Sequence, residues 1–74
     1  MNEEEVKEEL VYAIQVWQRG GDYKFELDNG TIIERECMDC FLNGAGWSVE
    51  DIPEDRIEEI ASAYIDCFRL DLFF

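Results

Sequence analysis

The alternation of apolar and polar residues is sharpest over residues 22–36, where it predicts a β-hairpin. Asn29-Gly30 lies in the middle of this stretch and is a typical hairpin turn sequence. On the N-terminal side of the turn, apolar residues alternate with charged ones at the two-residue period of a strand, at Tyr23, Phe25 and Leu27.

Two registers of this hairpin are compatible with the turn sequence. A two-residue loop would place Phe25 opposite Glu34. A three-residue loop, with Gly30 in the left-handed conformation, places Phe25 opposite Ile33 instead. It also places Lys24 opposite Glu34. Because a one-residue slip moves every side chain to the other face, the register that pairs like with like is favoured, and we expect the three-residue loop.

Before the hairpin, apolar residues recur at the spacing of an amphipathic helix. The predicted helix has Asn2 as its N-cap, and Glu5 stands three residues on, as a capping box requires. Gly20-Gly21 ends it. We expect its buried stripe to consist of Val6, Leu10, Ala13, Ile14 and Trp17.

After the hairpin, residues 37–43 carry enough apolar side chains for one or two helical turns. Ser48 and Asp51 then form a second, weaker capping-box pattern. Pro53 suits the first position of a helix over residues 53–68. The residues expected to face inward on that helix are Ile57, Ile60, Ala61, Tyr64 and Phe68.

The tail Leu70–Phe74 is too apolar to remain in solvent. We expect it either to pack back, as a strand beside the hairpin, or to form a homodimer contact. The whole pattern predicts one α+β domain over residues 1–74, in the order helix, β-hairpin, short helix, helix. An isolated hairpin is marginal in water, so both long helices should cover one face of the two-stranded antiparallel sheet.

Composition adds one strong feature to this picture, which is charge. The chain has 47% hydrophobic residues and ten aromatic ones, which favours a packed core over disorder. It nevertheless has 19 Asp and Glu against six Lys and Arg, for a net charge of −13. Such acidity exceeds what solubility requires, and it excludes direct binding to nucleic acid or to anionic lipid.

Cys37 and Cys40 have CxxC spacing, and Cys67 is a third thiol. A structural zinc site needs four nitrogen or sulfur ligands, and the chain has no histidine to complete one. The acidic neighbours Glu36 and Asp39 disfavour the thiolate that redox chemistry needs. We therefore expect core or half-buried cysteines without zinc or disulfide. The odd cysteine count, with no signal peptide or long apolar run, indicates a reduced, soluble, cytoplasmic chain.

Carboxylate pairs one helical turn apart, such as Glu4/Glu8 and Asp55/Glu59, are candidates for metal binding or acid–base catalysis. Such work requires a pocket that separates the pKa values of the two groups, and these pairs lie on helix faces predicted to be exposed. The chain also lacks a recognisable nucleophile–base pair. We expect no enzyme activity, no metal and no cofactor.

The density of the carboxylates is more informative than any pair of them. Residues 3–9 carry five acids over about 10 Å of helix, or about one per 2 Å. Duplex DNA carries one charge per about 1.7 Å of its axis. A rigid fold with this density would compete for the Lys and Arg side chains that bind phosphate.

In its size, Glu-rich first helix, acidic hairpin, acidic second helix and reduced cysteines, the chain resembles the DNA-mimic proteins that phages make during host takeover. It is similar to the small acidic early proteins of large lytic phages of Gram-positive bacteria, one of which blocks the histone-like protein HU. The resemblance implies a non-enzymatic inhibitor, in the bacterial host cytoplasm, that associates with the nucleoid through a basic DNA-binding protein. HU is the first candidate because it is a small minor-groove binder. The carboxylates expected to contact the partner are Glu4, Glu8, Glu26, Asp28, Glu34, Asp55, Glu59 and Asp66.

A rival hypothesis assigns the acidity to solubility. The protein would then be a regulatory adaptor that binds a host enzyme or polymerase through an apolar patch of Val11, Tyr12 and the tail Leu70–Phe74. Salt separates the two hypotheses, because charge mimicry weakens as ionic strength rises and an apolar contact does not.

Overall fold

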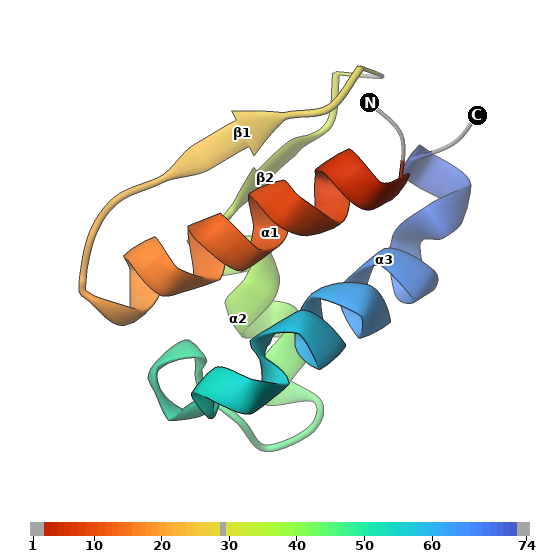
Figure 1. Cartoon of the computed structure of the whole chain (residues 1–74). Helices are drawn as coiled ribbons and strands as arrows, with labels where there is room; N and C mark the ends of the chain where they lie inside the picture. Colours follow the sequence, from red (N-terminus) through yellow and green to blue (C-terminus); the bar gives the residue numbers. More distant parts are fainter. Residues whose placement is uncertain (1–2, 29, 73–74) are drawn as a thin grey trace.

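The α+β fold predicted from the sequence is confirmed in the computed structural model, which describes the backbone of residues 3–28 and 30–72 and the side chains of these ranges as far as Cys67 (Figure 1). A long helix, a hairpin, a short helix and a second long helix follow one another, in the expected order. The elements are α1 (Glu3–Gln18), β1 (Lys24–Glu26), β2 (Ile32–Glu34), α2 (Arg35–Asn43), the 3-10 turns η1 (Val49–Asp51) and η2 (Glu54–Arg56), and α3 (Ile57–Leu72).

Helix α1 buries the stripe that its periodicity predicted. Its buried side chains are Val6, Leu10, Ala13, Ile14 and Trp17. The first turn contains three glutamates, which favour the positive end of the helix dipole. The predicted cap at Asn2 lies outside the described residues.

The C-terminal end of α1 is fixed by a two-glycine cap. The Gly20 amide donates to the Trp17 carbonyl at 3.0 Å, and the Gly21 amide donates to the Val16 carbonyl at 3.0 Å. These two bonds form a Schellman motif, which requires a left-handed residue, and Gly20 has a φ of +82°. The helix therefore ends where the sequence predicted.

The hairpin has the predicted three-residue loop. Phe25 pairs with Ile33 and Lys24 pairs with Glu34, and Gly30 has a φ of +89°. One face of the hairpin enters the core, and the opposite face is open to solvent, since Ile32 there is 50% exposed. Both long helices consequently share a core with the same face of the sheet, as expected.

A pair of hydrogen bonds ties the start of the hairpin to α1. The Trp17 indole N–H donates to the Tyr23 carbonyl at 2.8 Å. The Tyr23 hydroxyl donates to the Glu9 carboxylate. The indole N–H is thus satisfied while the Trp17 ring is fully buried, which is the usual condition for burying tryptophan.

The segment between the hairpin and α3 differs from the prediction at three points. Strand β2 continues directly into α2, which begins at Arg35, two residues earlier than expected. The Ser48 hydroxyl donates to the Asp51 carboxylate at 2.8 Å instead of capping a backbone N–H, so the predicted capping box is wrong. Pro53 is the N-cap of η2, with a ψ of 146°, and the α-helix begins only at Ile57.

Helix α3 begins and ends four residues later than predicted, and residues 57–72 contain no Gly or Pro to end it earlier. Residues 70–72 are helical, so the predicted tail strand is wrong, and the sheet has two strands within the described ranges. Phe73 and Phe74 lie outside them. Among the described side chains of α3, those of Ile57, Ala61, Tyr64 and Ile65 are buried, and Ile60 is half-buried. The prediction missed Ile65, and the side chain of Phe68, also predicted to face inward, lies outside the described ones.

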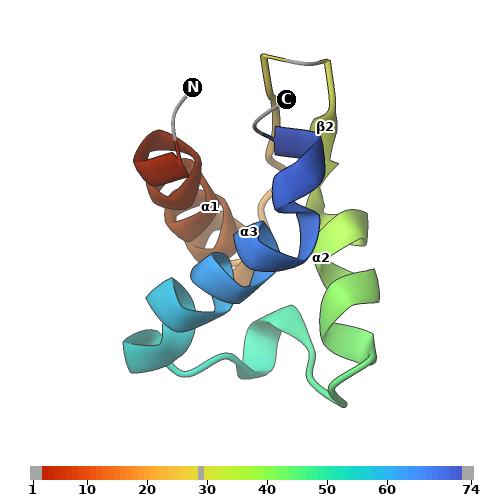
Figure 2. The same ribbon diagram turned by 90° about the vertical axis from the view of Figure 1, so that its right-hand side faces the viewer.

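The long helices run antiparallel, so the end of α3 and the start of α1 lie at the same end of the molecule (Figure 1). Seen from the end of the molecule, α1 lies on one side, the hairpin and α2 on the other, and α3 between them (Figure 2). The core contains side chains from every one of these elements, and no charged residue is buried among the described side chains.

Gln18 joins the end of α1 to the turn that precedes α3. Its side-chain amide donates to the Val49 carbonyl at 3.1 Å and to the Ile52 carbonyl at 2.9 Å. Both amide hydrogens are therefore used, and two carbonyls outside regular helix are satisfied.

We predict that Gln18→Ala lowers the free energy of unfolding by about 1–3 kcal/mol, because the Ile52 carbonyl loses the Gln18 donor and the Val49 carbonyl keeps only its long bond from the Ile52 amide. Gln15→Ala is the matched control on the same helix, since Gln15 is also half-buried, and it should change stability by less than about 0.5 kcal/mol. Urea unfolding measures both values. Equal effects of the two substitutions would contradict the assigned role of Gln18.

Candidate functional site

The carboxylates predicted to contact a partner all lie on the surface of the molecule. Seven of the eight are exposed and Glu34 is half-buried. They occupy two regions, the long helices with the turn before α3, and the hairpin with its own turn. Glu4 and Glu8 lie on α1, Asp55 on η2, and Glu59 and Asp66 on α3, whereas Glu26, Asp28 and Glu34 lie on the hairpin and its turn.

Glu4 and Glu8 lie in a shallow groove between α1 and α3. The groove has a volume of about 230 Å³, and the side chain that faces them from α3 is Glu58. Lys7 and Val11 complete its lining. The structure thus brings together three carboxylates from two helices, with one lysine among them.

The prediction had chosen Asp55 and Glu59 on the second long helix. Asp55 lies in η2 and Glu59 on α3, and both are exposed but do not line the groove. Glu58 follows the buried Ile57, so it sits at the margin of the packed face and reaches α1. Glu54, four residues earlier and within η2, lines a second groove against α1, and the i, i+4 spacing of the two glutamates was the sequence signal for this.

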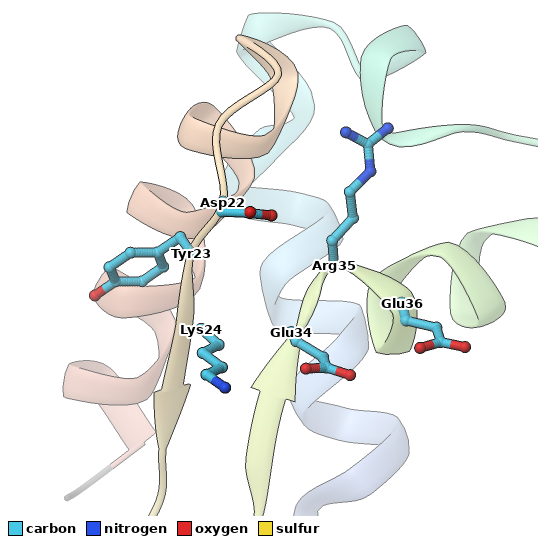
Figure 3. Close-up of a pocket in the computed structure, with 6 residues that line it drawn as sticks. All are labelled: Asp22, Tyr23, Lys24, Glu34, Arg35 and Glu36. Atoms are coloured by element: carbon cyan, nitrogen blue, oxygen red, sulfur yellow. The ribbon is translucent and has the colours of Figure 1, made fainter.

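A larger open cleft of about 580 Å³ lies at the base of the hairpin (Figure 3). Lys24 and Glu34 lie next to one another across the two strands, and the Tyr23 ring points away toward α1. The six lining residues include no serine, threonine or cysteine nucleophile, so their arrangement offers charge without an evident reaction. They are Asp22, Tyr23, Lys24, Glu34, Arg35 and Glu36.

Arg35 is the side chain at this cleft that the sequence did not single out. Its guanidinium points away from the strands, pairs with Glu50, and lies 3.5 Å from the Asp39 carboxylate. A third bond runs to the Trp17 carbonyl at 3.2 Å. The hydrogen bond with Glu50 raises the pKa of Arg35, although partial burial opposes this. Arg35 therefore joins α1, α2 and η1 and is engaged within the fold.

The cysteine prediction is correct for one residue and wrong for two. Cys37 is half-buried, whereas Cys40 and Cys67 are exposed, and all three thiols are free. On α2 the buried positions are Met38 and Leu42, one turn apart, so Cys40 between them faces outward. Among the described residues, no cluster of three His, Cys, Asp or Glu side chains is placed to hold a metal ion.

The apolar patch of the adaptor hypothesis is described only at Val11 and Tyr12. Val11 is half-buried against the core and lines the groove with α3. Tyr12 is exposed on α1 and does not line the groove, and its ring meets the Tyr23 ring edge-on at 5.2 Å. The side chains of the tail Leu70–Phe74 lie outside the described ones.

Comparison of the chain with protein families, with curated proteins and with solved structures found no match. No helix within the described ranges is both long and apolar enough to span a membrane. The functional argument therefore rests on the surface of this molecule.

Tyr64 is a titratable group inside the core, and its ring meets the Phe41 ring edge-on at 5.3 Å. Burial raises the pKa of Tyr64 from 10.0 to about 12, and the nearby negative charge of the Cys37 thiolate adds to this. A buried phenol resists ionisation because the phenolate loses its hydration.

The raised pKa of Tyr64 predicts a specific alkaline instability. The neutral phenol contributes stability that is fully present below pH 10 and is lost as the pH rises through about 12. The loss amounts to roughly 2–3 kcal/mol. Urea unfolding at increasing pH should therefore show a smaller alkaline decline for Tyr64→Phe than for the wild type, with Tyr12→Phe as the control for an exposed tyrosine. Identical declines for all three proteins would refute this assignment.

Proposed function

We propose that the protein is a non-enzymatic DNA mimic that binds the DNA-binding surface of a basic host protein and displaces DNA. The observation that carries the proposal is the placement of the predicted carboxylates on the outside of one rigid, fully apolar core. The chain acts in the bacterial cytoplasm and reaches the nucleoid through its partner.

The dimensions of the molecule support this proposal. The fold measures 31 × 22 × 20 Å. A DNA duplex as long as its 31 Å axis carries about 18 phosphate charges. The protein carries 19 carboxylates and a net charge of −13, so its charge per unit length approaches that of the duplex. A protein surface that uses Lys and Arg to contact phosphates would therefore attract this protein as well as the DNA duplex.

HU is the first candidate partner. It is a small architectural protein that binds the minor groove, and such proteins draw most of their affinity from backbone charge and little from base-specific contacts. A decoy for such a protein needs correctly spaced negative charge and no base edges. The α1–α3 groove, with Glu4, Glu8 and Glu58, provides such charge from two helices on one side of the molecule.

The proposal predicts complete competition between this protein and DNA for HU. In a gel-shift assay, excess protein should remove the HU–DNA band at low salt and do so less effectively at high salt. The logarithm of its affinity should fall linearly with the logarithm of salt concentration, with a slope shallower than that of DNA, because a folded protein condenses fewer counterions. An HU–DNA band that persists at low salt would exclude HU as the target.

Charge-reversal variants locate the contact surface. The double variant Glu4→Lys/Glu8→Lys should bind HU about tenfold more weakly, because each of the two lost attractions and two new repulsions contributes about 0.3–0.4 kcal/mol at an exposed site. Asp22→Lys/Glu36→Lys changes the net charge by the same amount at residues not predicted to contact the partner, and it should have a smaller effect. Circular dichroism checks that both variants fold. Equal weakening would show that only net charge matters.

A further inference from the structure

Two large apolar side chains are exposed among the described residues, and they differ in what they can bind. Ile32 is 50% exposed on the outer face of the hairpin, where it is an aliphatic residue beside charged neighbours. Tyr12 is 54% exposed on α1 and presents an aromatic ring to solvent. An exposed aromatic ring on a strongly acidic surface is an attractive contact for a cation.

The ring of Tyr12 is held in place by the ring of Tyr23. It packs against the Tyr23 ring at 5.2 Å with an interplanar angle of 80°. Tyr23 is itself fixed at both ends, by the Trp17 indole N–H on its carbonyl and by its own hydroxyl bond to Glu9. A partner that binds Tyr12 therefore meets a side chain that is already ordered, which reduces the entropy lost on binding.

Carboxylates lie beside this ring on the preceding helical turn. Glu8 and Glu9 are four and three residues before Tyr12, so they are its nearest neighbours along the surface of α1. Side chains on a helix lean toward its N-terminus, so the Tyr12 ring leans over the turn that carries these two residues. Glu9 is engaged with Tyr23, whereas Glu8 is exposed at the margin of the α1–α3 groove.

We propose that Tyr12 and Glu8 together bind one arginine side chain of the basic partner, an inference that rests on the proposed function. A guanidinium is planar, so it stacks on an aromatic face while its N–H groups form a bidentate bond with a carboxylate. A lysine ammonium supplies charge without this combined geometry. Proteins that grip the minor groove insert arginines there, and the Tyr12–Glu8 pair offers such an arginine an alternative site.

Arginine selectivity is the property that tests this inference. Binding of hexa-arginine and hexa-lysine peptides at low salt, measured by calorimetry, compares two probes of equal length and charge. Tyr12→Leu keeps an apolar side chain against Tyr23 and removes the π face, and Tyr12→Phe keeps the π face. We expect Tyr12→Leu to bind hexa-arginine about two- to fivefold more weakly, with a smaller change for hexa-lysine. Tyr12→Phe should bind both peptides like the wild type.

Two outcomes overturn the inference: Tyr12→Leu binds both peptides as the wild type does, or it loses affinity for both equally. Because the peptides test Tyr12 without HU, the result is separable from the proposed function. If the wild-type protein leaves HU on DNA, the proposed function is rejected. If Tyr12→Leu loses arginine selectivity in the same set of experiments, the arginine site is supported. Circular dichroism confirms that α1 is intact in both variants, as the high helix propensity of leucine predicts.

Discussion

The packing of α1 against α3 is the interaction on which the rest of the structure depends. The two helices pack their apolar stripes into one core. Gln18, at the end of α1, binds the turn that precedes α3. Arg35, at the start of α2, binds the Trp17 carbonyl of α1 and the Glu50 carboxylate of η1. The hairpin is too short to be stable alone, and it is ordered because its apolar face completes the core that the helices begin. A 74-residue chain has few apolar side chains to spare, so this one core must offset the mutual repulsion of the carboxylates.

The same constraint determines where the charge lies. Every described charged side chain is excluded from the core, so the carboxylates are held on a rigid surface with spacings set by the helices and the hairpin. Of the six cations in the chain, Arg35 is engaged by Glu50 and Asp39. A rigid arrangement of unbalanced negative charge is what a DNA decoy requires, because a flexible acidic chain would lose more entropy when it binds.

Local patterns in the sequence were sufficient for much of the fold. The three-residue turn, the Phe25–Ile33 register and the buried stripe of α1 each follow from periodicity that tertiary contacts reinforce. The bonds of Gln18 to Val49 and Ile52, and those of Arg35 to Trp17 and Glu50, were not predictable, since each joins residues at least 15 positions apart and no local pattern marks the partner. For the site, exposure of the carboxylates was predictable from helix faces. The placement of Glu58 in the same groove as Glu8, and the contact of the Tyr12 ring with the Tyr23 ring, depend on the packing of whole elements.

The most direct test of DNA mimicry is to map the surface that a basic partner covers. Nuclear magnetic resonance of isotope-labelled protein, titrated with HU at low salt, reports the contacted residues through their backbone amides. The account predicts shifts at the amides around Glu4, Glu8 and Glu58, which line one groove, and a return toward the free spectrum when duplex DNA is added. Shifts confined to α2 around Cys40, or shifts that duplex DNA does not reverse, would contradict it.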